Sequence, residues 1–107
     1  MTNTLIVVIC NWNKKDDVIE CLDSVYDARI AKMSVIVVDN ASTDGSIEAL
    51  ENYNKFSFTL IKNVQNLGGS GGFNTGINAA LKIGCEYIHL LDNIFFCPSR
   101  KQLHKML

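Results

Sequence analysis

Residues 4–10, TLIVVIC, form a nearly continuous run of β-branched and other apolar side chains. Such a run is typical of a strand that is buried on both faces of a parallel sheet. The runs SVIVVD at residues 34–39 and YIHLL at residues 87–91 have the same character. Residues 55–62 instead alternate apolar with polar or smaller side chains, which predicts a further strand nearer an edge. We therefore expect four strands.

Helical spacing of apolar residues separates these predicted strands. It predicts a helix over residues 15–27, a shorter helix around residues 47–53, and a third whose apolar face begins at Phe73. Residues 66–76, NLGGSGGFNTG, hold five of the seven glycines and are expected to form a flexible loop that leads into the third helix. The alternation of strand and helix predicts an α/β fold, with a mostly parallel sheet and helices on both faces.

Length and composition limit the range of functions. A chain of 107 residues has room for one domain, and 48% hydrophobic with 20% charged residues is ordinary for a globular protein. The formal net charge of −1 gives no broad attraction to nucleic acid, so we expect no nucleic-acid partner. The apolar run at residues 5–10 is too short to span a membrane and lacks the flanks of a signal peptide. We expect a cytoplasmic protein, and attachment to the periphery of a membrane is left open.

Polar and glycine-rich residues follow the carboxyl ends of the predicted strands, where parallel α/β folds bind ligands. Asp39 closes a buried strand, and either a ligand contact or a turn cap explains an aspartate there equally well. The glycines of residues 66–76 allow backbone N–H groups to approach a phosphate, and the following helix adds partial positive charge at its N-terminus. A helix-entry loop without a ligand is the alternative. The glycine spacing matches neither a P-loop nor a dinucleotide-binding fingerprint.

Other residues of chemical interest carry weaker signals. Asp92 follows the last predicted strand and offers one carboxylate to a divalent cation. The cysteines form no C-x-x-C pair, so the sequence suggests no zinc site. His89 lies inside a predicted apolar strand, which favours packing over catalysis, and His104 lies in the tail, which favours solvent exposure over catalysis. Trp12 is a candidate for stacking on a ligand, although an aromatic residue after a buried strand more often closes a core.

Four segments, taken in order, make a more specific pattern: VVICNWNKKDDVIECLDSV, IVVDNASTDGS, NLGGSGGFNTGINAAL and YIHLLDN. Over about residues 4–93 this pattern resembles the N-terminal half of family 2 glycosyltransferases of the GT-A fold, especially the rhamnosyl- and galactofuranosyltransferase-like branch. The resemblance implies a GT-A-like (Rossmann-like) nucleotide-sugar-binding half-domain at residues 1–93 and a divergent tail at residues 94–107. It also implies transfer from a nucleotide-diphosphate sugar to a glycan or other acceptor, in cell-wall or polysaccharide biosynthesis.

The resemblance further implies site residues. Asp39 resembles the aspartate that recognises the base, and Asp92 resembles the first aspartate of the D-x-D motif that binds Mg²⁺ or Mn²⁺ and the diphosphate. Ile94 stands at the second acidic position of that motif, which weakens the expectation of a metal. The implied nucleotide-sugar-binding residues are Asn11, Trp12, Asn13, Asp39, Asn40, Asn66, Gly68, Gly69, Gly72 and Asp92.

After Asn93 the family pattern ends, and the acceptor-binding half with its catalytic base has no counterpart. We therefore expect a chain that is truncated within the D-x-D motif, for which a frameshift is one explanation, and that is inactive alone, with catalytic residues unknown. The alternative is a non-catalytic nucleotide-binding or protein-interaction α/β module, with the apolar tail as a route to a homo-oligomer. A response-regulator-like domain needs an acidic cluster after the first strand, and the sequence Asn11-Trp12-Asn13 argues against it.

Overall fold

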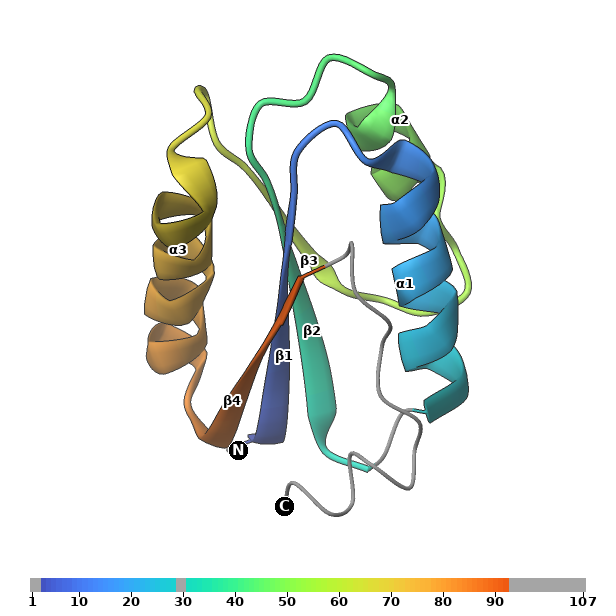
Figure 1. The fold of residues 1–107 in the computed structure, drawn as a ribbon. Coiled ribbons are helices and arrows are strands. Elements are labelled where there is room, and N and C mark those ends of the chain that lie inside the picture. Colours follow the sequence, from blue (N-terminus) through green and yellow to red (C-terminus); the bar gives the residue numbers. More distant parts are fainter. Residues whose placement is uncertain (1–2, 29–30, 93–107) are drawn as a thin grey trace.

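The computed structural model describes residues 3–28 and 31–92. Within these residues, strands and helices alternate along the chain as the sequence predicts (Figure 1). The elements are β1 (Asn3–Asn11), α1 (Lys15–Ala28), β2 (Met33–Asp39), α2 (Ser46–Asn52), β3 (Thr59–Lys62), α3 (Gly68–Ile83) and β4 (Cys85–Asp92).

The four strands form one sheet in the order β3-β2-β1-β4, and every pair is parallel. Helices α1 and α2 cover one face of the sheet and α3 covers the other (Figure 1), which confirms the predicted α/β arrangement. In the strand register, Asn11 lies beside Asp39 and Cys10 lies beside Asp92. The carboxyl ends of β1, β2 and β4 therefore meet at one edge of the sheet, the upper edge in Figure 1.

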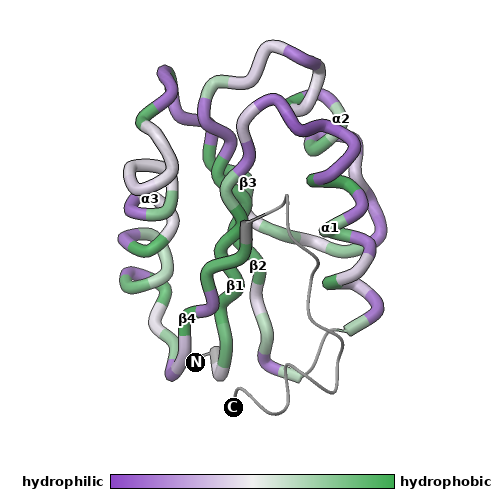
Figure 2. Tube along the Cα trace, viewed as in Figure 1, coloured by the Kyte–Doolittle hydropathy of each residue, from purple (hydrophilic) through white to green (hydrophobic). Residues whose placement is uncertain are grey.

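The core consists of two apolar layers that share the central strands. Leu5, Val7 and Ile9 of β1 pack toward α1 and α2, whereas Ile6 and Val8 pack toward α3. All five are at most 1% exposed. Figure 2 shows the central strands as continuous hydrophobic segments between helices of mixed hydropathy. Burying each such side chain contributes about 1.5–3 kcal/mol to folding stability. The sheet is therefore a stable support for the loops at its carboxyl edge.

The glycine-rich segment differs from the prediction, because it is helical rather than a flexible loop. Helix α3 begins at Gly68 and includes most of residues 66–76. A Cβ at Gly72 would overlap Cys10 Sγ, and a Cβ at Gly76 would overlap Val8 Cγ1. The glycines thus allow the helix to lie close against β1, and this packing outweighs their poor helix propensity of about 1 kcal/mol each.

The segment between α2 and β3 also differs from the prediction. The third strand is present but begins at Thr59, and α2 ends before Tyr53. The apolar alternation of this segment reflects an aromatic cluster, in which Phe56 lies with its ring centre 5.6 Å from that of Tyr53 and 5.9 Å from that of Phe58. These rings pack against the core on the side of α1 and α2.

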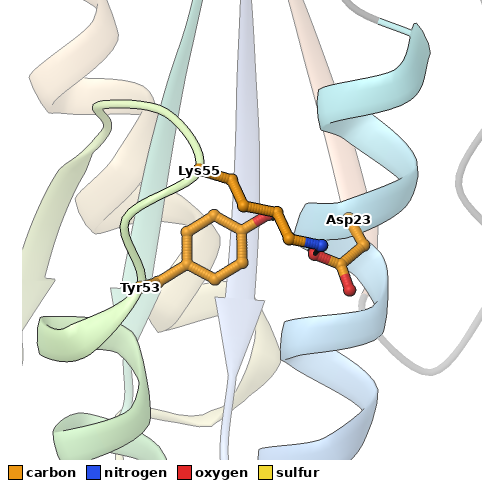
Figure 3. A network of polar contacts seen from close by, with 3 residues as sticks. All are labelled: Asp23, Tyr53 and Lys55. Atoms are coloured by element: carbon orange, nitrogen blue, oxygen red, sulfur yellow. Dashed lines mark hydrogen bonds and ion pairs between the residues drawn. The ribbon is translucent and has the colours of Figure 1, made fainter.

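A polar network ties this aromatic segment to α1 (Figure 3). The Tyr53 hydroxyl donates a hydrogen bond of 2.9 Å to Asp23 Oδ1, and Lys55 Nζ lies 2.9 Å from the same oxygen. The hydrogen bond from Lys55 lowers the pKa of Asp23, and burial together with the bond to Asp23 raises the pKa of Tyr53. The network joins residues thirty positions apart on one face of the sheet.

Candidate functional site

The connections β1–α1, β2–α2 and β3–α3 all begin at the carboxyl edge of the sheet (Figure 1). This edge therefore brings together the predicted site segments at residues 11–13, 39–40 and 66–72. Asp92 ends β4 at the same edge, because its backbone pairs in register with Cys10.

Asn11, Asp39 and Ser42 form a hydrogen-bonded cluster at the ends of β1 and β2. Asp39 Oδ1 accepts bonds from Asn11 Nδ2 at 2.9 Å and from the Ser42 hydroxyl at 2.8 Å. Asp39 Oδ2 accepts a bond from the Ser42 backbone N–H at 2.8 Å. Asn11 and Asp39 are 0% exposed. Asp39 therefore stabilises the turn that follows β2, which is one of its two predicted roles, and its carboxylate accepts three bonds within the protein.

The first two connections are linked to each other by their own hydrogen bonds. The Asn13 backbone N–H donates to Ser42 Oγ at 2.9 Å, and the Thr43 N–H donates to Asn13 Oδ1 at 2.7 Å. Asn13 and Ala41 adopt left-handed backbone conformations, with φ of 51° and 64°. Non-glycine residues rarely adopt this conformation, which indicates that the reciprocal bonds hold both connections in one fixed arrangement.

Asp44 extends this link to the first turn of α1. Asp44 Oδ2 accepts a bond of 3.0 Å from the Lys15 N–H, and Asp44 Oδ1 accepts bonds from the backbone N–H and hydroxyl of Ser46. Burial raises the pKa of Asp44, but the bonds from Ser46 and Lys15 outweigh it, so the pKa of this carboxyl is lowered. A hollow of about 310 Å³ lies beside it, lined by Asn13, Lys14, Lys15, Asp16, Asp17 and Asp44.

Asn40 connects the end of β2 to the β3–α3 connection. Its Nδ2 donates to the Gly68 carbonyl at 2.9 Å, and its Oδ1 accepts from Asn63 Nδ2 at 2.9 Å and from the Leu67 N–H at 3.3 Å. Asn40 Nδ2 also lies 3.7 Å from Cys10 Sγ. The residue is 2% exposed, so its side chain lies between the elements that it joins.

The N-terminus of α3 is open toward solvent. No side chain caps the helix at Leu67, and Gly68, at φ 77°, and Gly69 have no atom within 4 Å of an added Cβ. The Gly68 N–H donates to the side chain of the exposed Asn66 at 2.8 Å. An uncapped N-terminus of a 16-residue helix carries partial positive charge and backbone donors, which suit an anionic group.

Two further predicted residues differ in exposure. Trp12 is 52% exposed, so the interpretation that it closes the core is wrong, and its ring is accessible to a ligand. His89 is partly buried within β4, and burial lowers its pKa, which fits a packing role.

A larger cavity of about 620 Å³ lies between α2 and β3, away from these residues and next to the aromatic cluster.

The structure therefore gathers residues 11–13, 39–40, 66–72 and the backbone of Asp92 at one edge, as predicted. Ser42, Asp44 and Asn63 also belong to this edge, although the sequence assigned them no role. The polar turn at residues 40–46 was a signal for Ser42 and Asp44, whereas no sequence signal identifies Asn63. Some predictions lie outside the described residues. They concern Ile94, His104, the domain boundary after residue 93, and the predicted oligomer contact of the tail.

Among residues 3–28 and 31–92, no group of three or more His, Cys, Asp or Glu side chains is arranged to hold a metal ion. Over the same described ranges, no helix combines the length and apolar character needed to cross a bilayer.

Comparisons with known proteins agree with this geometry. Residues 6–106 match the family model described as glycosyl transferase family 2. A poly(ribitol-phosphate) beta-glucosyltransferase from Bacillus spizizenii is 34% identical over 90 residues, which is 81% of this chain and 14% of that protein. Galactofuranosyltransferase GlfT1 from Mycolicibacterium smegmatis is 32% identical over 95 residues, which is 87% of this chain and 31% of that protein.

A solved structure shares the fold. The mannosyltransferase PcManGT from Pyrobaculum calidifontis, in complex with GDP-Man and Mn²⁺, superposes with a TM-score of 0.81 at 27% identity. The superposition covers 96% of this chain and 31% of that one. The chain thus spans less than a third of the length of each of these proteins.

Proposed function

Because this chain belongs to glycosyl transferase family 2, we propose that its carboxyl edge binds the nucleoside diphosphate part of a nucleotide-sugar donor. The observation that carries the proposal is the open N-terminus of α3, which lies against the ends of β1 and β2 through Asn40 and Gly72. Backbone N–H groups at such a terminus provide donors and partial positive charge for a diphosphate. The similar mannosyltransferase PcManGT, which is in complex with GDP-Man, supports this class of ligand.

The exposed residues of the edge have distinct roles in this proposal. Gly69 presents its backbone N–H to the diphosphate, whereas the Gly68 N–H is held by the side chain of the exposed Asn66. Trp12 offers an accessible aromatic face to the nucleoside, since bases stack on such rings. Asn11 and Asp39 shape the connection that follows them. Recognition of the base by Asp39 stays a prediction.

We also propose that a divalent cation binds together with the diphosphate. Mg²⁺ or Mn²⁺ would take one carboxylate from Asp92 and its other oxygen ligands from the diphosphate and water. The backbone of Asp92 pairs in register with that of Cys10, whose thiol lies against Gly72, so the end of β4 lies close to α3. Bound there, the cation would neutralise charge on the departing diphosphate.

The sugar-transfer reaction is proposed for the family's full-length members, with a glycan as acceptor. The names of the two relatives, a poly(ribitol-phosphate) glucosyltransferase and a galactofuranosyltransferase, support an acceptor in a cell-wall or other polysaccharide. We expect the 107-residue chain alone to bind the donor without appreciable turnover. Transfer also requires a positioned acceptor and a base, and the base alone typically contributes about 10²- to 10⁴-fold in rate.

Titration of the isotopically labelled 107-residue chain with GDP or UDP in the presence of Mg²⁺, followed by NMR, tests this proposal. We expect saturable amide shifts at residues 11–13, 40–44 and 66–72. Replacing Mg²⁺ with paramagnetic Mn²⁺ should broaden the signals of α3's first turn and of the end of β4. The absence of a saturable response at millimolar nucleotide, or shifts confined to other segments, would reject the donor site.

Matched variants locate the cation. Asp92→Asn should remove the broadening by Mn²⁺ while leaving the fold intact. Asp27→Asn, an exposed substitution at the far end of α1, should retain the broadening.

Release of nucleoside diphosphate in the presence of several donors and acceptors measures turnover. Robust acceptor-dependent release by the 107-residue chain would contradict the expectation that it lacks transfer activity.

A further inference from the structure

We propose that Asn40 is a positioning residue that holds the N-terminus of α3 in place for the diphosphate, and does not itself contact the nucleotide. This inference rests on the proposed donor site and assigns Asn40 a different role from the direct contact that the family resemblance implies. It concerns a single side chain that links β2 to two other elements.

The hydrogen-bonding capacity of Asn40 is fully used within the protein. An asparagine amide has two N–H donors and one oxygen with two lone pairs. Nδ2 donates to the Gly68 carbonyl at 2.9 Å and lies 3.7 Å from Cys10 Sγ, and Oδ1 accepts from Asn63 and from the Leu67 N–H. At 2% exposure the side chain has neither a free group nor an accessible surface for a ligand.

The bonds of Asn40 reach the residues at which α3 begins. Leu67 is the N-cap position and Gly68 the first residue of the helix, and no side-chain bond caps the helix at Leu67. Gly68 has a positive φ of 77°, and the space that an added Cβ would occupy is open. Asn40 therefore supplies fixed contacts to the backbone just where the proposed anion site needs a defined geometry.

Gly72 makes this arrangement possible one turn further along the helix. A Cβ at Gly72 would lie 2.8 Å from Asn40 Nδ2 and would overlap Cys10 Sγ. The missing side chain thus allows Asn40 and Cys10 to lie directly under the first turn of α3. A group that is preorganised in this way need not be ordered when the ligand binds, which strengthens binding.

Hydrogen exchange at two adjacent amides tests the contact in the nucleotide-free chain. The Leu67 N–H donates to Asn40 Oδ1, whereas the Gly68 N–H donates to Asn66 Oδ1. Asn40→Ala should speed exchange at Leu67 by about 2- to 10-fold, the range that follows from loss of one hydrogen bond. Asn66→Ala should instead speed exchange at Gly68 and leave Leu67 unchanged. Unaltered exchange at Leu67 in Asn40→Ala would overturn the proposal.

Nucleotide affinity tests the consequence of the contact. With GDP or UDP and Mg²⁺ as probes, Asn40→Ala should weaken binding by about tenfold or more, since small displacements of positioning groups have large effects. Asn78→Ala, on the exposed side of α3, should bind like wild type. Asn40→Asp keeps an acceptor for Leu67 but loses the donor to Gly68, so it should retain Leu67 protection and bind with intermediate affinity. Equal affinity of Asn40→Ala and wild type would overturn the proposal.

The two measurements separate failure of this inference from failure of the donor site. If the wild-type chain binds neither nucleotide, the proposed function fails, and exchange at Leu67 still decides whether Asn40 holds α3. Unchanged NMR signals in α1 and α2 will show that each variant is folded. If Asn40→Ala does not fold, Asn40→Asp carries the comparison, and binding by Asn40→Asp equal to that of wild type would count against the proposal.

Discussion

The side-chain amide of Asn11 donates a hydrogen bond of 2.9 Å to Asp39 Oδ1, and both residues are 0% exposed. The two residues end adjacent strands and are partners in the register of β1 with β2. Because neither side chain reaches water, the bond between them satisfies polar groups that are buried at the ends of the two strands. The carboxyl edge of the sheet is thus organised by buried polar contacts as well as by the apolar core below it.

Asp39→Ala should lower the free energy of unfolding by about 3 kcal/mol, because it removes the buried carboxylate that accepts bonds from the Asn11 amide and the Ser42 N–H. Asp39→Asn keeps an acceptor oxygen and should lower it less. Urea unfolding followed by circular dichroism measures both changes. Glu20→Ala, an exposed substitution on α1, is the control and should change stability by less than about 0.5 kcal/mol. A urea midpoint for Asp39→Ala equal to that of wild type would contradict the role assigned to this pair.

Three glycines of α3 should respond differently to alanine. Gly72→Ala and Gly76→Ala should each destabilise the chain by about 1–3 kcal/mol, because the new methyl groups overlap Cys10 and Val8. Gly69→Ala meets nothing within 4 Å and should be neutral or stabilising by up to about 1 kcal/mol. Thermal unfolding of the three variants provides the comparison. If Gly69→Ala proves as damaging as the other two, close packing against β1 is not what these glycines provide.

The Tyr53 hydroxyl should ionise only at a pH above the usual range for tyrosine, because its pKa is raised. Burial and the bond to Asp23 raise its pKa above the usual value of 10.0, so above that pH the unfolded chain loses this proton before the folded chain does. Stability should therefore fall with rising pH in this range, and Tyr53→Phe should reduce the fall. Absorbance at about 295 nm reports tyrosinate formation.

A matched control for this titration is Tyr87→Phe, because Tyr87 is 46% exposed. At neutral pH, Tyr53→Phe should also lose about 1 kcal/mol of stability, the usual net value of one hydrogen bond. A late-ionising tyrosine that persists in Tyr53→Phe would mean that Tyr53 is not the group with the raised pKa.

His89 should make the chain less stable in mild acid. Burial lowers its pKa below the usual value of 6.5, so as the pH falls through that value the unfolded chain binds a proton that the folded chain does not. The free energy of unfolding should decrease from pH 6.5 down to the folded-state pKa of His89. His89→Gln should lose this dependence while retaining His104, and urea unfolding at pH 7.5 and pH 5 measures the difference. An unchanged dependence in His89→Gln would assign the effect to another group.

Local sequence patterns predicted the order of strands and helices, the parallel sheet, and the edge at which polar residues gather. The apolar runs at residues 4–10 and 34–39 suffice for this, because nearly every consecutive side chain must be apolar in a strand that is buried on both faces. The four quoted segments also indicated the family, which the match over residues 6–106 confirms.

The tertiary structure alone decided the form of the glycine-rich segment and the role of Asn40. Glycine disfavours a helix locally, and α3 forms through Gly72 and Gly76 because Cys10 and Val8 occupy the space that side chains would need. Asn40 likewise looks the same in sequence whether it binds a ligand or a helix terminus. Its partners are more than twenty residues away, and contacts over such separations exist only after the strands have paired and brought the connections together.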